Sequence, residues 1–220
     1  MAKVGVILSG CGVYDGSEIH EAVITLLALD RAGAEAVCMA PDIDQMHVVN
    51  HLTGAVAEGE TRNVLVESAR IARGKIVDIK EVTVADYDAL LLPGGFGAAK
   101  NLCDFAVKGA DCAVNPEVAR LLNETVKAGK PLGAVCIAPA LLAKVLGMEY
   151  APSLTIGSDT GTAAAVQSMG ATHIVCPVRE AVIDREHKIV TSPAYMLAGR
   201  ISEAADGIEE TVRILLSMVD

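Results

Sequence analysis

A cysteine stands where an apolar, strand-like segment gives way to a helical pattern. In "GAVCIAPALLAK", residues 133–144, Cys136 follows small apolar residues and precedes Pro139. The start of a helix offers free N–H groups and the positive end of the helix dipole, and both favour a thiolate over a thiol. Cys136 is therefore a candidate nucleophile. Cysteine is also among the most often buried residues, so core packing explains this position equally well when it is taken alone.

A glycine-rich loop could stabilise a reaction at this cysteine. "PGGFG", residues 93–97, follows a short apolar run. Consecutive glycines let backbone N–H groups approach a reacting oxygen, and we expect the N–H groups of Gly95 and Ile137 to form an oxyanion hole. If no ligand binds there, the same loop is only a tight turn.

Acidic and imidazole side chains lie together in "GSEIHEAV", which contains Glu18, His20 and Glu21. A carboxylic acid beside a thiolate can share a proton with it, and we assign this role to Glu21, with His20 as an assisting group. For Glu18, offsetting the helix dipole is the favoured role. His51, in a long polar segment, and Cys11, in "SGCG", are further candidates. For His20, His51 and Cys11 an ordinary polar contact or simple packing is the more common alternative.

The elements that must position these residues alternate between strand and helix patterns. Short apolar runs predict strands, and apolar residues at helical spacing predict helices. The predicted strands are residues 3–8, 34–42, 75–79, 89–92, 131–135, 153–157 and 173–178, and two more that meet in a hairpin at 185–187. The predicted helices are residues 21–33, 64–74, 116–130, 137–146, 162–170 and 200–219, and one that follows the glycine loop.

Strands separated by helical crossovers predict an α/β fold with a mainly parallel sheet, and such sheets bind ligands at the carboxyl ends of their strands. Three segments fall at that edge: "SGCGVYDGSE", "PGGFGAAKN" and "CIAP". We therefore expect the candidate residues to meet there. The polar segment 42–63 is longer than an ordinary connection, and long loops are often functional.

Composition limits the classes of function. The 220 residues, 52% of them hydrophobic, suffice for one domain, and a net charge of −10 without a basic cluster argues against a nucleic-acid partner. No apolar run approaches the roughly 20 residues that span a membrane, and the first residues do not resemble a signal peptide, so we predict a cytoplasmic protein. The cysteines form no CxxC pair, so we predict reduced thiols and neither a metal site nor a disulfide framework. The six cysteines are Cys11, Cys38, Cys103, Cys112, Cys136 and Cys176.

Several of these motifs together resemble one family. "LLPGGFGAAKNL", "AVCIAPA" and "GSEIHEAV" are similar to the DJ-1/PfpI superfamily of the class I glutamine amidotransferase-like fold. The opening "ILSGCGVYDGSEIHEAV", with "NHLTG", "TRNVLVESARI" and "TSPAYMLA", resembles the branch of the enhancing-lycopene-biosynthesis protein (isoprenoid biosynthesis glyoxalase) and the ES1 proteins. The resemblance extends over essentially the whole chain.

The resemblance implies a flavodoxin-like three-layer sandwich, with residues 1–220 as a single DJ-1/PfpI-like domain and a homodimer as the assembly. It also implies that Cys136 stands on a strained nucleophile elbow, that Glu21 is its acidic partner, and that Gly95 is the oxyanion-hole glycine.

One position departs from the family pattern. Where many relatives carry a triad histidine, "SLTIGSD" has Gly157 and Ser158. Amidotransferase and protease chemistry uses a histidine to shuttle protons during acyl transfer, so this departure argues against both.

The resulting hypothesis is a glyoxalase that needs no cofactor, metal or glutathione. Cys136 attacks glyoxal or a related 2-oxoaldehyde, Glu21 transfers the proton, and the N–H groups of Gly95 and Ile137 hold the oxyanion. The product is a 2-hydroxy acid, and a link to isoprenoid biosynthesis is implied by resemblance alone.

Two alternatives belong to other classes. The protein could be a non-catalytic redox sensor or regulator in which Cys136 is oxidised, since both functions need an accessible, reactive thiol. "GCGVYDG", with Asp42 after the second predicted strand, also resembles a dinucleotide-binding loop, although its spacing departs from the strict G-x-G-x-x-G pattern.

Overall fold

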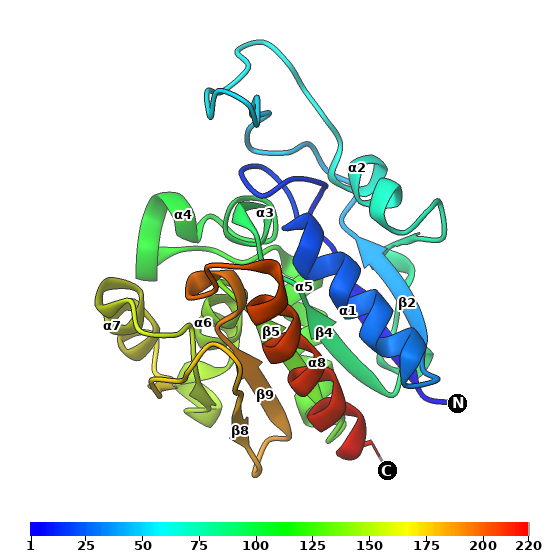
Figure 1. The fold of residues 1–220 in the computed structure, drawn as a ribbon, viewed down its shortest axis with the longest axis vertical. Helices are drawn as coiled ribbons and strands as arrows, with labels where there is room; N and C mark the ends of the chain where they lie inside the picture. The colour runs from blue at the N-terminus through cyan, green and yellow to red at the C-terminus, as the bar shows by residue number, and fades with distance from the viewer. Residues whose placement is uncertain (220) are drawn as a thin grey trace.

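The computed structural model describes residues 1–219 and contains a sheet of seven strands in the order β3-β2-β1-β4-β5-β9-β8 (Figure 1). All neighbouring strands are parallel except β8 and β9, which confirms the predicted mainly parallel α/β fold. The strands are β1 (Lys3–Ile7), β2 (Glu35–Ala40), β3 (Val77–Asp78), β4 (Ala89–Leu92), β5 (Leu132–Val135), β8 (Val182–Asp184) and β9 (Ile189–Ser192).

Helices cover both faces of this sheet. On one face α1 (Ile19–Arg31) and α8 (Ile201–Ser217) pack side by side, with α2 (Val64–Ile71) next to α1 (Figure 1). On the other face α5 (Pro116–Lys127) and α6 (Pro139–Tyr150) pack together. The remaining helices are α3 (Phe96–Lys100), α4 (Phe105–Lys108), α7 (Thr160–Ser168) and the 3-10 turns η1 (Ile79–Glu81), η2 (Val84–Asp86), η3 (Gly109–Asp111) and η4 (Ala194–Met196). Within residues 1–219 no helix combines the length and apolar character that crossing a membrane requires.

The neighbouring strands β4 and β5 are apolar and buried at every position because both faces of the sheet are covered. In β4 all four residues are buried, with Leu90 and Leu92 in the apolar cluster that includes α5 and α6. Ala89 and Leu91 belong to the opposite cluster, which includes α1 and α8. A parallel sheet buried on both sides produces such continuous apolar runs rather than alternation.

Helix α5 begins where the sequence predicts. The side chain of Asn115 accepts a hydrogen bond from the N–H of Glu117, and Pro116 occupies the first helical position. An Asn cap satisfies a free N–H group, and the fixed φ of proline suits the first turn.

Some predicted strands are much shorter in the structure. The predicted strand 75–79 is reduced to β3, and the segments 153–157 and 173–178 contribute only β6 (Ser153–Leu154) and β7 (Thr172–His173), which form a separate two-stranded sheet. The pairing with β7 ends after β6 because the N–H of Thr155 donates to the side-chain hydroxyl of Thr191 in β9, and that of Gly157 donates to the hydroxyl of Thr155. The predicted hairpin at 185–187 is confirmed by the antiparallel pairing of β8 and β9.

The polar segment 42–63 projects from the layered body at the top of Figure 1. Two isolated bridges, Asp44 with Asn63 and Val49 with Val56, hold it together. The N–H of Val49 donates to Asp15 at 2.8 Å, which attaches the segment to the loop after β1. The segment therefore stands beside the carboxyl edge of the sheet.

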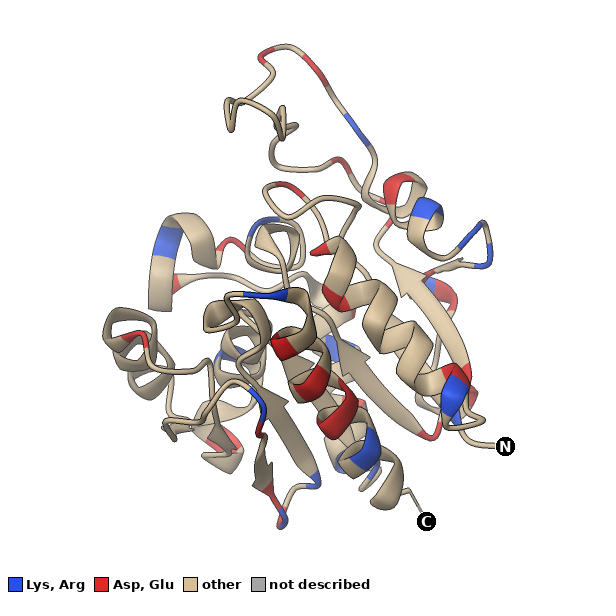
Figure 2. Cartoon of the chain, in the orientation of Figure 1, with Lys and Arg blue, Asp and Glu red and all other residues tan. Residues whose placement is uncertain are grey.

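Acidic residues are prominent along α8 (Figure 2). Several of these acids form ion pairs with arginines, including Arg31 with Glu209 and Arg213 with Glu210. Exposed pairs of this kind contribute little to stability, about 0–1 kcal/mol each.

Candidate active site

Cys136 occupies a sharp turn between β5 and α6. Its φ is 61°, in the left-handed region that costs a non-glycine residue about 1–2 kcal/mol. Its N–H donates to the carbonyl of Ser192 at 3.0 Å, so the pairing with β9 continues up to the turn itself. The side chain is 7% exposed. The local geometry is thus the strained elbow that the family resemblance implies.

Glu21 stands in the first turn of α1 and points into the same site. The Glu18 carboxylate caps α1 by accepting the N–H of Glu21 at 2.7 Å. The Glu21 side chain is fully buried, and its two oxygens accept the N–H groups of Gly94 at 2.9 Å and of Tyr195 at 3.1 Å. The carboxyl also lies within hydrogen-bonding reach of the Cys136 thiol. Glu21 is therefore held by backbone groups from two distant segments.

Burial raises the pKa values of both groups. Burial raises the pKa of Glu21 to about 7, and the charge of Glu18 acts in the same direction. Burial, followed by the charge of Glu21, raises the pKa of Cys136 well above its usual value, while the N–H groups of Gly95 and Ile137 lower it. Backbone N–H groups at the turn into the helix therefore lower the pKa of Cys136, as predicted. The prediction that the thiolate is favoured overall is wrong, because burial raises this pKa by more than the N–H groups lower it. Above about pH 7 the pair keeps one proton, which the two groups can share.

The glycine loop is fitted tightly around this pair. A Cβ on Gly94 would lie 2.4 Å from the Cβ of Cys136 and 2.7 Å from Oε2 of Glu21, so only glycine fits. Gly95 has a φ of 98°, and its N–H is directed at the Cys136 sulfur together with that of Ile137. The structure therefore brings together Cys136, Glu21, Gly95 and Ile137, which the sequence placed on three separate segments.

His20 does not join this group. Its side chain is 52% exposed, and its Nδ1 forms a 2.8 Å hydrogen bond with the hydroxyl of Tyr195. His51 is bound within the loops, where its Nε2 accepts the N–H of Tyr14 at 3.2 Å. In the part of the chain that the structure describes, no histidine forms a hydrogen bond with Cys136. The expected assistance of His20 therefore has no direct geometric basis, because the ring points away from the sulfur.

The backbone at the position of the missing triad histidine disfavours a side chain. Gly157 has a φ of 98°, which L side chains rarely adopt, and a Cβ there would lie 2.9 Å from Cγ of Leu197, so that Leu197 would have to shift. Ser158, the next residue, is exposed. The backbone conformation thus favours glycine over histidine at residue 157.

The loop after β1 does not form a dinucleotide site. The N–H of Gly10 donates to a serine hydroxyl of α2, and those of Gly12 and Gly16 donate to carbonyls within the same loop. Asp42, the expected ribose-binding acid, accepts a hydrogen bond from a side-chain amide at 2.7 Å. These N–H groups are used by the fold and cannot hold a phosphate.

Cys11 is not among the residues that line the pocket at Cys136. It is half-buried, and burial, followed by the charge of Glu67, raises its pKa. All six cysteines are free. Across residues 1–219 no cluster of three or more His, Cys, Asp or Glu side chains is arranged to bind a metal ion.

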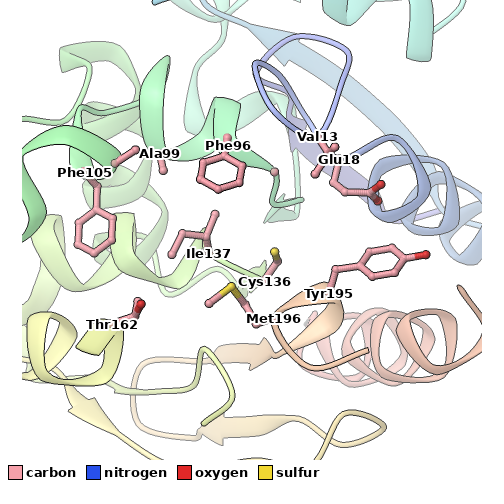
Figure 3. Close-up of a pocket in the computed structure, with 12 residues that line it drawn as sticks. Val13, Glu18, Phe96, Ala99, Phe105, Cys136, Ile137, Thr162, Tyr195 and Met196 are labelled. Atoms are coloured by element: carbon pink, nitrogen blue, oxygen red, sulfur yellow. The ribbon is translucent and has the colours of Figure 1, made fainter. Parts of the chain in front are cut away.

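A pocket of about 340 Å³ opens beside Cys136 (Figure 3). Most of its walls are apolar, and helices α3, α4 and α7 contribute as well as the elbow. The lining residues are Val13, Glu18, Gly95, Phe96, Ala99, Phe105, Ala106, Cys136, Ile137, Thr162, Tyr195 and Met196.

Sequence reasoning missed several residues of this site. Tyr195 lies within "TSPAYMLA", and Gly94 lies within the glycine loop, so motif matching could have drawn attention to both. Phe105 and Thr162 lie on short helices without a motif. Only the folded chain brings them to the pocket.

Known proteins resemble this chain over nearly its full length. Residues 11–195 match the DJ-1/PfpI family. The chain is 52% identical to the human "glutamine amidotransferase-like class 1 domain-containing protein 3, mitochondrial" over 99% of this chain and 83% of that protein. It is 36% identical to the zebrafish (Danio rerio) "ES1 protein, mitochondrial" over 88% of this chain and 77% of that protein.

A solved structure is also very similar. An Ehrlichia chaffeensis isoprenoid biosynthesis protein with an amidotransferase-like domain superimposes with a TM-score of 0.94 at 38% identity, covering 100% of both chains. Agreement at that level extends to the whole order of strands and helices.

The relatives correct one prediction. The human and zebrafish proteins are both named as mitochondrial, which contradicts the predicted cytoplasmic location. That prediction depended on the composition of the first residues and on the lengths of apolar runs. Neither property identifies the compartment in which a protein works.

Proposed function

The chain belongs to the DJ-1/PfpI family, and from this premise we propose that it is a glyoxalase that needs no cofactor. The observation that carries the proposal is the buried pair of Cys136 and Glu21, with two backbone N–H groups directed at the sulfur beside an open pocket. A thiol, an acid/base and an oxyanion site are the groups that this reaction needs.

The reaction begins with addition of the Cys136 sulfur to the aldehyde carbon of a 2-oxoaldehyde. A C–S bond forms, and the thiol proton passes through Glu21 to the new oxygen, which gives a hemithioacetal. Removal of the C1 proton and its return to C2 produce a thioester of the 2-hydroxy acid. Water then cleaves the C–S bond, which releases the acid and restores the thiol, so that the net change is addition of one water.

Glu21 is suited to the proton transfers. A pKa of about 7 lets it exist both with and without its proton near neutral pH. The N–H groups of Gly95 and Ile137 would hold the oxyanion that develops beside the sulfur. These steps do not require a histidine, which agrees with the exclusion of His20 from the site and with the glycine-favouring backbone at Gly157.

Amidotransferase activity is less favoured. Acyl transfer from glutamine depends on a histidine that moves protons to the leaving group. The redox-sensor alternative needs the same accessible thiol at Cys136, and the turnover test below separates it from the glyoxalase.

Two further expectations remain proposals. A link to isoprenoid biosynthesis is supported by the name of the Ehrlichia chaffeensis protein. Homodimerisation is expected from the family resemblance, and light scattering of the purified protein would test it.

The first test is conversion of glyoxal to glycolate by metal-stripped protein without glutathione. We expect the wild type to be active and Cys136→Ala to lose at least about a thousandfold in kcat/KM. Glu21→Gln should lose about 10²–10⁴-fold.

Cys11→Ala is the matched control, because Cys11 lies near the same edge of the sheet but outside the pocket. It should keep wild-type activity. A wild type that folds but converts no glyoxal or other 2-oxoaldehyde, or a Cys136→Ala variant that stays active, would refute the proposed reaction.

A further inference from the structure

Away from Cys136, Thr162 is the one polar side chain among the lining residues that the structure describes. Figure 3 shows Phe105 and Thr162 on the side opposite to Glu18 and Tyr195, with Cys136 between the two sides. The walls on the Phe105 side are completed by apolar side chains: Phe96, Ala99, Ala106, Ile137 and Met196.

The polar side chains of the lining have their polar ends engaged elsewhere. The Glu18 carboxylate caps α1, and the Tyr195 hydroxyl is bonded to His20 at 2.8 Å. The Thr162 hydroxyl interacts with Asp159. Glu18 and Tyr195 therefore present mainly their carbon atoms to the pocket, and Figure 3 shows their oxygens directed away from Cys136.

The reactive end and the apolar end impose a direction on a bound molecule. A carbonyl group must lie at Cys136, where the N–H groups of Gly95 and Ile137 converge. The rest of the molecule then extends toward Phe105, where Thr162 is the one polar side chain among the described lining residues and its hydroxyl interacts with Asp159. Burying a charge or several hydroxyls there would cost free energy because these walls offer few groups to replace their hydration.

The size of the pocket favours a substituent larger than that of glyoxal. A volume of about 340 Å³ lies within the usual range of small-molecule sites, and a two-carbon dialdehyde would leave most of it unfilled. Each buried methylene contributes about 0.8 kcal/mol, which is about fourfold in affinity.

We propose that the preferred substrates are 2-oxoaldehydes with an apolar substituent the size of a phenyl ring or a branched alkyl chain. The inference rests on the proposed glyoxalase function and adds the substrate class. The chemistry is unchanged: R–CO–CHO and water give R–CH(OH)–COOH, so that phenylglyoxal gives mandelate. The substituent would also help to exclude water while the proton moves from C1 to C2.

The test compares kcat/KM for glyoxal, methylglyoxal and phenylglyoxal at equal concentrations of the unhydrated aldehyde. We expect phenylglyoxal to exceed methylglyoxal by at least about tenfold. Phe105→Ala should remove most of this preference by lowering kcat/KM for phenylglyoxal. Val107→Ala is the matched control, because Val107 is 66% exposed on the same short helix and does not line the pocket.

A second measurement does not depend on turnover. Phenacyl bromide and bromoacetone are large and small α-bromo ketones that alkylate thiols, and mass spectrometry can follow each reaction at Cys136 with Cys11 as internal reference. We expect the ratio of the phenacyl rate to the bromoacetone rate to be at least about tenfold higher at Cys136 than at Cys11, and lower in Phe105→Ala.

The outcomes separate the two proposals. Turnover of all three aldehydes without a preference for phenylglyoxal overturns the substrate class and leaves the glyoxalase function standing. Selective phenacylation of Cys136 without turnover of any 2-oxoaldehyde overturns the glyoxalase function and supports an apolar carbonyl site. Absence of selectivity in both measurements overturns the inference.

Discussion

The two ends of the pocket differ in the groups that form them: backbone groups at one end and side chains at the other. At the reactive end, backbone groups position Cys136 and Glu21, through N–H groups of Gly94, Gly95 and Tyr195. At the far end, the walls are side chains on the short helices α3, α4 and α7. Backbone groups held by a sheet edge cannot adjust independently, whereas side chains on short surface helices can be exchanged with little effect on the fold.

The difference suggests how chemistry and specificity can be separated in this molecule. An added carbon atom at the reactive end displaces the groups that react, because the contacts there are already at their limit. A changed side chain at the far end alters only what fits. Variants at the two ends should therefore differ in kind: the first lose all activity, and the second change preference among substrates.

The largest effect in this comparison is expected for Gly94→Ala. Its Cβ would lie 2.4 Å from the Cβ of Cys136, so the cysteine and Glu21 must move apart. We expect kcat/KM for every 2-oxoaldehyde to fall at least about a hundredfold, since misplacement by about 1 Å can cost that much. Steady-state kinetics would measure it.

Gly161→Ala is the control for this change. Gly161 lies in α7, and the nearest atom to its added Cβ is 3.6 Å away, an ordinary contact. It should retain wild-type kinetics. If Gly94→Ala is as active as Gly161→Ala, the reactive end is more adaptable than proposed.

The next largest effect is the pH dependence that Glu21 gives to the free energy of unfolding. The pKa of Glu21 is raised from 4.5 to about 7 in the folded protein, so the folded state binds more protons than the unfolded state between these values. This contribution to stability is present below about pH 4.5 and is lost as the pH rises through about 7. Relative to Glu21→Gln, the wild type should lose on the order of 3 kcal/mol in free energy of unfolding across this window.

Urea denaturation of both proteins between pH 4 and about pH 8 would measure the difference. Glu186→Gln, at an exposed position in the β8–β9 turn, is the control and should follow the wild-type curve. Parallel curves for the wild type and Glu21→Gln would show that the carboxyl is not held in the buried, proton-retaining state described above.

The smallest effect is expected for His20→Ala. The ring contacts the Tyr195 hydroxyl on the outer side of the pocket and forms no hydrogen bond with the reactive pair. We expect kcat/KM to change by less than about threefold, with an unaltered pH profile. A tenfold loss together with a shifted pH profile would restore the histidine to the mechanism and extend the reactive end to the protein surface.

Local sequence patterns were sufficient for much of the fold. Three features were predicted correctly because residues adjacent in the sequence determine them. They are the apolar run of β4, the proline at the start of α5 and the turn between β8 and β9. The predicted strand at 173–178 failed because hydrogen bonding to a partner strand, which the local pattern does not reveal, decides how far a strand continues.

The sequence by itself placed Cys136, Glu21 and Gly95 at ends of strands and helices, since a strand-to-helix junction and a glycine pair are local features. Only the tertiary structure decided that burial raises the pKa of Cys136, that Leu197 lies against Gly157, and that Phe105 completes an apolar wall. The physical reason is the same in each case. Burial, steric exclusion and pocket shape are set by residues that are distant in the chain, and they arise only when the elements pack against one another.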